Sequence, residues 1–260
     1  MTRRVGGATV EVHSTADDAR RDVARRIAGL LRERGARGAV LALPTGATPR
    51  GVYAELLRLH REEGLSFRHA TVFQLDEYWP MRPEDPGSFA RELDEGLLGL
   101  VDQDPARRHR PDGAAPPEDV TRACAAYGAA LAAAGGLDLA LLGLGRNGHV
   151  AYNEPGSPRN ARTRRVTLAD ESRRDAARTF GGLQHVPREA LTLGVADLLE
   201  ARDVLLVALG EAKADVVTRA LQGPIGSDCP ASFLREHPHA LWVLDRAAAA
   251  GLPAMAGRAR

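Results

Sequence analysis

The chain has 260 residues, and 35 Lys and Arg against 34 Asp and Glu give a formal net charge of +1. This balance argues against a general nucleic-acid-binding or membrane-surface protein, which carries a basic excess. Hydrophobic residues make up 44% of the chain, which is enough for a buried core. The two cysteines, Cys124 and Cys229, form no zinc-like cluster, and neither a signal peptide nor an apolar run of ~20 residues is visible. We therefore expect a cytoplasmic protein without a metal site.

Strand and helix patterns alternate along the chain. In chain order we expect strand 8–12, helix 15–34 capped by Ser14, strand 39–43, helix 49–59, strand 70–75, helices 88–98 and 118–133, strand 137–142, helix 188–199, strand 204–209, helix 211–221 and strand 241–244. This order predicts an α/β fold: a doubly wound, mostly parallel sheet in three α/β/α layers, as one domain over 1–260. The polar, arginine-rich segment 159–183 is predicted to be a mobile cover. Ligands of such sheets bind at the carboxyl ends of the strands.

The loop after strand 39–43 carries hydroxyl groups and a glycine. Thr48 is expected to be the N-cap of the next helix, and Pro49 its first residue. Gly46 permits close backbone approach, and Thr45 adds a second hydroxyl beside Ala47. Free N–H groups at a helix N-terminus bind anions. The loop is therefore either a phosphate site or only a well-capped helix start.

Two adjacent carboxylates, Asp76 and Glu77, follow strand 70–75. They are either a general acid/base pair or solvated turn residues. Because side chains alternate along an extended chain, we expect only one of them to face a ligand.

The segment 143–148 matches the pattern GxGxxG. A dinucleotide site requires a helix to begin there, but a turn signal at 153–156 follows instead, so we exclude that function. His149 has Glu154 close behind it, and a carboxylate can hold the tautomer of an imidazole and raise its basicity. His149 is thus a candidate acid/base, although a single histidine is more often a surface residue.

The basic residues are almost all arginine, since Lys213 is the one lysine and the other 34 are arginine. Lys213 lies near the start of a predicted helix, where a cation opposes the helix dipole unless an anion binds nearby. A compact ammonium at this point indicates an anion site; the alternative is an incidental residue.

Taken together, these motifs resemble the glucosamine-6-phosphate deaminase family of sugar-phosphate isomerases and deaminases. The similarity runs over about 10–245, and its carriers are 43–49, 75–78, 148–155 and 190–195. The resemblance implies hydrolytic deamination and aldose–ketose isomerisation of glucosamine 6-phosphate to fructose 6-phosphate and ammonia. It implies a small-molecule partner and no redox cofactor or obligatory metal, and it fits a monomer and a homo-oligomer alike.

The resemblance also assigns acid/base roles. Asp76 would move a proton between C2 and C1 of the opened sugar, and His149 would open the ring with support from Glu154. Asn147 stands where many family members have aspartate. The neighbouring site candidates are Glu77, Tyr78 and Gly148.

The phosphate ligands of the family fall on three places in the sequence. They are the loop from Thr45 to Thr48, Arg178 and Lys213. The segment 159–183 corresponds to the lid of the family, and Arg178 would close on the phosphate with it.

Three other functions fit parts of the pattern. A deaminase acting on galactosamine 6-phosphate or another amino-sugar phosphate shares all the motifs. A 6-phosphogluconolactonase has a similar Gly-His loop but a different continuation from 150–155. A sugar-phosphate sensor that binds DNA would carry a basic excess, which this chain lacks.

Overall fold

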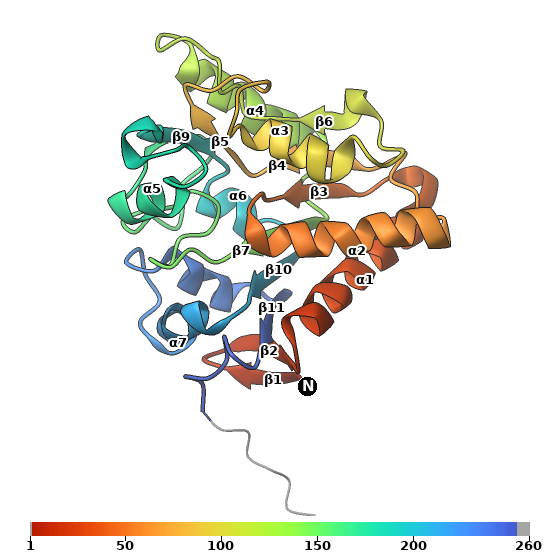
Figure 1. Ribbon diagram of the computed structural model, residues 1–260, viewed down its shortest axis with the longest axis vertical. Coiled ribbons are helices and arrows are strands. Elements are labelled where there is room, and N and C mark those ends of the chain that lie inside the picture. The colour runs from red at the N-terminus through yellow and green to blue at the C-terminus, as the bar shows by residue number, and fades with distance from the viewer. Residues whose placement is uncertain (1, 254–260) are drawn as a thin grey trace, which may run out of the picture.

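A computed structural model describes residues 2–253, and its centre is an eight-stranded sheet (Figure 1). In spatial order the strands are β1 Thr2–Val5, β2 Ala8–His13, β11 Ala240–Asp245, β10 Asp203–Ala208, β7 Leu139–Gly143, β3 Val40–Leu43, β4 Thr71–Gln74 and β6 Arg108–His109. Strand β1 is antiparallel to β2, and all other neighbours are parallel. The predicted α/β class and mostly parallel sheet are confirmed. The predicted domain, 1–260, includes Met1 and 254–260, which lie outside the described residues.

Helices connect the strands. They are α1 Ala16–Arg34, α2 Ala47–Glu63, α3 Phe89–Leu93, α4 Val120–Ala133, α5 Asp170–Ala176, α6 Val195–Leu199 and α7 Ala214–Gln222. Shorter turns are the 3-10 helices η1 Gly35–Arg37, η3 Pro105–Arg107, η4 Leu183–His185, η5 Glu211–Lys213 and η6 Pro230–Glu236, and the π-helical turn η2 Asp94–Leu98. The predicted cap of α1, Ser14, is wrong by one position, because the hydroxyl of Thr15 accepts from the Asp18 amide at 3.1 Å. Within the described residues, no helix is long and apolar enough to cross a membrane.

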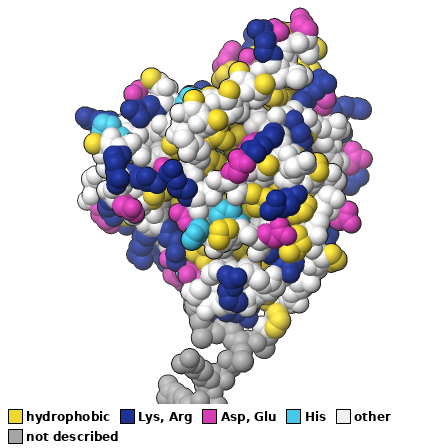
Figure 2. All heavy atoms as spheres, turned by 180° about the vertical axis from the view of Figure 1, so that it is seen from behind, with side chains coloured by type: hydrophobic (Ala, Val, Ile, Leu, Met, Phe, Trp, Pro, Cys, Tyr) yellow, Lys and Arg dark blue, Asp and Glu magenta, His cyan; other side chains and the backbone are white. Residues whose placement is uncertain are grey.

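The helices pack on both faces of the large sheet. Side chains alternate along each strand, so Leu41 and Leu43 of β3 join the core beneath α1 and α2, whereas Ala42 joins the core beneath α4, α6 and α7. Outside these cores, charged side chains of both signs are interspersed, as on the face in Figure 2. This mixture agrees with the near-zero net charge.

A second, antiparallel sheet was not expected from the sequence. It contains β5 Asp76–Trp79, β9 Glu189–Thr192 and β8 Arg164–Thr167, in the order β5–β9–β8. The predicted helix 188–199 is therefore wrong in its first half. The segment is extended because strands distant in sequence satisfy its backbone on both sides, and the helix begins only after Gly194.

The parallel strands deliver three loops to one edge of the large sheet. Strand β3 leads into the start of α2, β7 leads into the Gly-rich loop 143–149, and β10 leads into η5 with Lys213. Beside them the small sheet carries Asp76 at the start of β5. This edge holds the candidate site.

Candidate active site

A cavity of about 530 Å³ opens at the carboxyl edge of the parallel strands. Its lining includes most residues that the sequence singled out: Thr45, Gly46, Ala47, Thr48, Asp76, Tyr78, His149, Arg178 and Lys213. The remaining candidates do not line the cavity and instead lie behind its wall: Glu77, Asn147, Gly148 and Glu154. The residues that line the cavity can contact a ligand, and the four others can act only by supporting them.

The start of α2 forms one end of the cavity. The predicted N-cap, Thr48, is wrong, because Thr48 is the second residue of the helix and the cap is Gly46. The backbone of Gly46 has a φ of 104°, a conformation that favours glycine. No acceptor in the described part of the chain takes the amide protons of Ala47 and Thr48. The Gly46 amide donates to the carboxylate of Glu92 at 2.7 Å. Two free amides at a helix N-terminus can bind an anion.

Two cations, Lys213 and Arg178, also line the cavity. The Lys213 ammonium donates to the Leu144 carbonyl at 2.6 Å, and burial lowers its pKa. Arg178 is exposed, and its guanidinium has no carboxylate partner among the described residues. Both charges are therefore available to an anionic group in the cavity.

Asp76 is buried and lines the cavity. Its carboxyl group receives no hydrogen bond from the described residues, and burial together with the charge of Glu77 raises its pKa to about 8. A carboxyl group with a pKa near neutrality is suited to proton transfer.

Glu77 points to the other side of β5. Its carboxylate accepts from the Ser88 hydroxyl at 2.9 Å and from the amides of Phe89 and Ala90 at 3.0 and 2.8 Å, at the start of α3. This carboxylate caps a helix and is not available to a ligand, as the alternation of side chains predicts.

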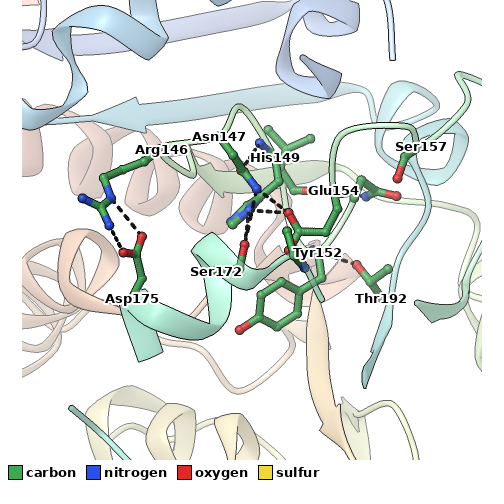
Figure 3. A network of polar contacts seen from close by, with 12 residues as sticks. Arg146, Asn147, His149, Tyr152, Glu154, Ser157, Ser172, Asp175 and Thr192 are labelled. Atoms are coloured by element: carbon green, nitrogen blue, oxygen red, sulfur yellow. Dashed lines mark hydrogen bonds and ion pairs between the residues drawn. The ribbon is translucent and has the colours of Figure 1, made fainter. Parts of the chain in front are cut away.

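His149 lines the cavity and belongs to a polar network (Figure 3). Its Nδ1 lies 3.2 Å from Glu154 Oε2, and Asn147 donates its amide to the same oxygen at 2.6 Å. Burial alone would raise the pKa of Glu154, but hydrogen bonds from His149 and its neighbours lower it to about 2. An ionised Glu154 requires a proton on Nδ1, which leaves Nε2 as the nitrogen available to a ligand.

Two glycines make room for this loop. A Cβ on Gly145 would lie 2.5 Å from the ring atoms of His149, so the imidazole rests directly on the backbone there. Gly148 has a φ of 96°, and a Cβ on it would lie 2.6 Å from Cys229 Sγ. The GxGxxG pattern thus serves the placement of a histidine and not the binding of a nucleotide.

Aromatic rings close the cavity beside Asp76. The hydroxyl of Tyr152 donates to that of Tyr78 at 2.8 Å. Phe180, from the segment predicted as a cover, packs edge-on against Tyr78 at 5.1 Å and lies against Gly87, where a Cβ would be 2.9 Å from its ring. The segment 159–183, which includes β8 and α5, therefore contacts the wall of the cavity.

Several residues at the site could not be found from sequence patterns. Ser172 bonds to His149, Asp175 pairs with Arg146, and Glu92 accepts from the start of α2. Each contact joins segments more than 20 residues apart, and no local spacing pattern marks such a pair.

One cluster with metal-ligand chemistry lies away from the cavity. Ligand atoms of Glu11, His13 and Asp22 lie within 4.8 Å of one another. Arg26 donates to both carboxylates at 2.7 Å, so a guanidinium already supplies positive charge there.

Comparison with known proteins agrees with this geometry. Residues 11–242 match the family model described as glucosamine-6-phosphate isomerases/6-phosphogluconolactonase. The chain is similar to the glucosamine-6-phosphate deaminase of Rhodopirellula baltica, with 45% identity over 86% of this chain and 89% of that protein. It is 40% identical to glucosamine-6-phosphate deaminase 1 of Bacillus subtilis, over 83% and 88%.

Solved structures show the same fold. A monomeric glucosamine-6-phosphate deaminase superposes with a TM-score of 0.90 and 37% identity, covering 93% of this chain and 99% of that one. The 6-phosphogluconolactonase of Trypanosoma brucei superposes with a TM-score of 0.76 and 24% identity, over 97% and 100%. The second similarity extends to the fold alone.

Proposed function

The chain belongs to the family of glucosamine-6-phosphate isomerases and 6-phosphogluconolactonases, and we propose that it converts glucosamine 6-phosphate and water to fructose 6-phosphate and ammonia. One observation carries the proposal: Asp76 and His149 line the same cavity as a helix N-terminus and two cations. Acid/base groups and an anion site are thereby placed around one small molecule. The similar curated proteins named above are deaminases.

The phosphate group belongs at the end of the cavity formed by α2. The amides of Ala47 and Thr48 would donate to it, and Lys213 and Arg178 would supply charge. Binding energy at this remote group holds the sugar carbons in place for the chemistry.

His149 is proposed to open the sugar ring. Because Glu154 and the proton on Nδ1 fix the imidazole, Nε2 is free to take the proton of the anomeric hydroxyl and to return it to the ring oxygen. Asn147 does not repeat the charge of an aspartate. Its amide donates to Glu154 at 2.6 Å and so favours the ionised form of that carboxyl group.

Asp76 is proposed to carry the proton between C2 and C1. Its pKa of about 8 leaves much of the carboxyl group protonated at neutral pH in the empty cavity. A substrate with an ammonium group on C2 would favour the carboxylate through its charge, so binding of the amino sugar itself prepares the base.

The segment 159–183 is proposed to be a lid that opens and closes over the cavity. In support, it carries both Arg178, which lines the cavity, and Phe180, which packs on Tyr78. Closure would bring the cation to the phosphate and exclude water from the enediol.

The test is an assay of the purified protein. With glucosamine 6-phosphate, fructose 6-phosphate and ammonia should appear in equal amounts, faster than with galactosamine 6-phosphate. Preference for galactosamine 6-phosphate would show that the proposed substrate is wrong. Hydrolysis of 6-phosphogluconolactone alone would show that the proposed reaction is wrong. Binding without any turnover would instead support a sensor.

A further inference from the structure

We propose that Ser172 is a positioning residue for His149. Its hydroxyl lies 3.2 Å from Nδ1 of the imidazole and 3.4 Å from the amide nitrogen of Asn147, and its side chain is buried (Figure 3). The role rests on the proposed function, in which His149 opens the sugar ring. Ser172 comes from α5, within the proposed lid, whereas His149, Asn147 and Glu154 belong to the segment that follows β7.

The hydroxyl group completes the support of the imidazole. Glu154 is ionised, so Nδ1 carries a proton and Ser172 Oγ can accept a share of it. The hydroxyl proton then remains free to donate to Glu154, a bond that contributes to the low pKa of that carboxyl group. Two partners, Glu154 and Ser172, thereby hold Nδ1 of the imidazole ring. This fixes the orientation of the ring, and with it the direction in which Nε2 points.

An ion pair holds α5 in this position. Asp175, one turn after Ser172, accepts from Arg146 of the loop 143–149, with a second contact from Nε at 3.1 Å. Residues three apart lie on the same side of a helix, so α5 touches the loop at two points, as Figure 3 shows. The Arg146 carbonyl accepts from Arg219 at 3.2 Å, which anchors the loop from behind.

The same ion pair protects the anion site. Asp175 lines the cavity together with Arg178 and Lys213, and an unpaired carboxylate at that place would repel a phosphate. Arg146 neutralises it. The pair therefore has two separable effects: it keeps Ser172 at His149, and it removes a negative charge from the binding site.

The hydroxyl is tested by three variants assayed with glucosamine 6-phosphate. Ser172→Ala should lower kcat about tenfold, as expected for one hydrogen bond, with KM within about twofold of wild type. Ser172→Thr keeps the hydroxyl and should restore most of kcat. Arg174→Ala, an exposed α5 position with no side-chain bond among the described residues, is the matched control and should match wild type. A wild-type kcat in Ser172→Ala, or a Ser172→Thr variant as slow as it, overturns the proposal.

The ion pair is tested by a double-mutant cycle. Arg146→Ala should lower kcat and raise KM about tenfold, because it leaves Asp175 unpaired beside the phosphate. Asp175→Ala should lower kcat without raising KM. The double variant should keep the low kcat while KM returns toward wild type. Independent, additive effects on KM would show that the pair does not neutralise the site.

A measurement without substrate separates this proposal from the proposed function. Relaxation of the imidazole C–H groups of His149 in the empty protein reports the mobility of the ring. The order parameter should fall in Ser172→Ala and recover in Ser172→Thr. If wild type fails to deaminate any amino-sugar phosphate, the proposed function is wrong, and the ring mobility still decides the role of Ser172.

Discussion

Asp76 and Glu77 are neighbours in β5, yet their carboxyl groups lie on opposite sides of the strand in different environments. Asp76 faces the cavity and receives no hydrogen bond from the described residues, whereas Glu77 accepts from Ser88 and from two amides of α3. The charge of Glu77 contributes to the raised pKa of Asp76. A helix cap thus also tunes the proposed base.

Asp76→Asn should remove turnover and keep binding. The amide has nearly the same shape but cannot accept the proton from C2, so kcat should fall about 1,000-fold. Binding of glucosamine 6-phosphate, measured by calorimetry, should stay within about threefold of wild type. Normal turnover in this variant would show that another group moves the proton.

The same substitution should stabilise the protein in a pH-dependent way. The folded state favours the protonated Asp76, whose pKa is about 8 against an ordinary value of 3.8, so wild type loses stability as pH rises through this interval. The asparagine variant has no such loss. The difference in Tm should be near zero at pH 4 and reach about 5 °C at pH 8. A constant difference from pH 4 to pH 8 would contradict the raised pKa.

Lys213→Arg should weaken substrate binding. The ammonium lines the cavity and donates to the Leu144 carbonyl at 2.6 Å, and a larger, planar guanidinium does not reproduce this compact point charge. KM should rise about tenfold, the cost of one charge-assisted hydrogen bond, with little change in kcat. An unchanged KM would make the single lysine of the chain incidental.

Six of the eight strands of the large sheet could be predicted because they are short apolar or alternating runs that local pattern reveals. The two edge strands, β1 and β6, could not be predicted, because their sequences are polar and only pairing with a neighbouring strand makes them extended. The small sheet could not. Glu189–Thr192 reads as the first turn of a helix, and only its pairing with β5 and β8 makes it a strand. The partner strand β5 lies more than 100 residues away in the sequence and β8 more than 20, and both separations are beyond the reach of a local pattern.

At the candidate active site, too, local sequence patterns predicted some residues and missed others. Motifs at the ends of strands placed Asp76, His149 and Lys213 at one cavity, because parallel strands share an edge. The predicted start of α2 is wrong, because a glycine with positive φ, Gly46, caps the helix in place of the Thr48 side chain. Ser172 carried no signal, because its role depends on how the segment 159–183 folds over the loop.

Gly145→Ala should disturb His149 without unfolding the protein. The added methyl group would lie 2.5 Å from the imidazole, so the ring must move away from its place over the cavity. A misplacement of about 1 Å lowers kcat about 100-fold. Gly29→Ala, with open space at its Cβ in α1, is the control and should keep full activity. Equal activities of the two variants would show that the ring position does not matter.

Phe180→Ala should loosen the proposed lid. The ring packs on Tyr78 at 5.1 Å and against Gly87, and its loss removes one of the apolar contacts that tie the segment 159–183 to the wall of the cavity. Backbone amides of α5 should exchange with deuterium faster, while Tm stays within about 2 °C of wild type and KM rises about fivefold. Leu183→Ala, an exposed position in the same segment, is the matched control and should leave both exchange and KM unchanged. Unaltered exchange in Phe180→Ala would mean that other contacts hold the lid. Faster exchange in both variants would mean that any substitution in the segment loosens it and that Phe180 has no special role.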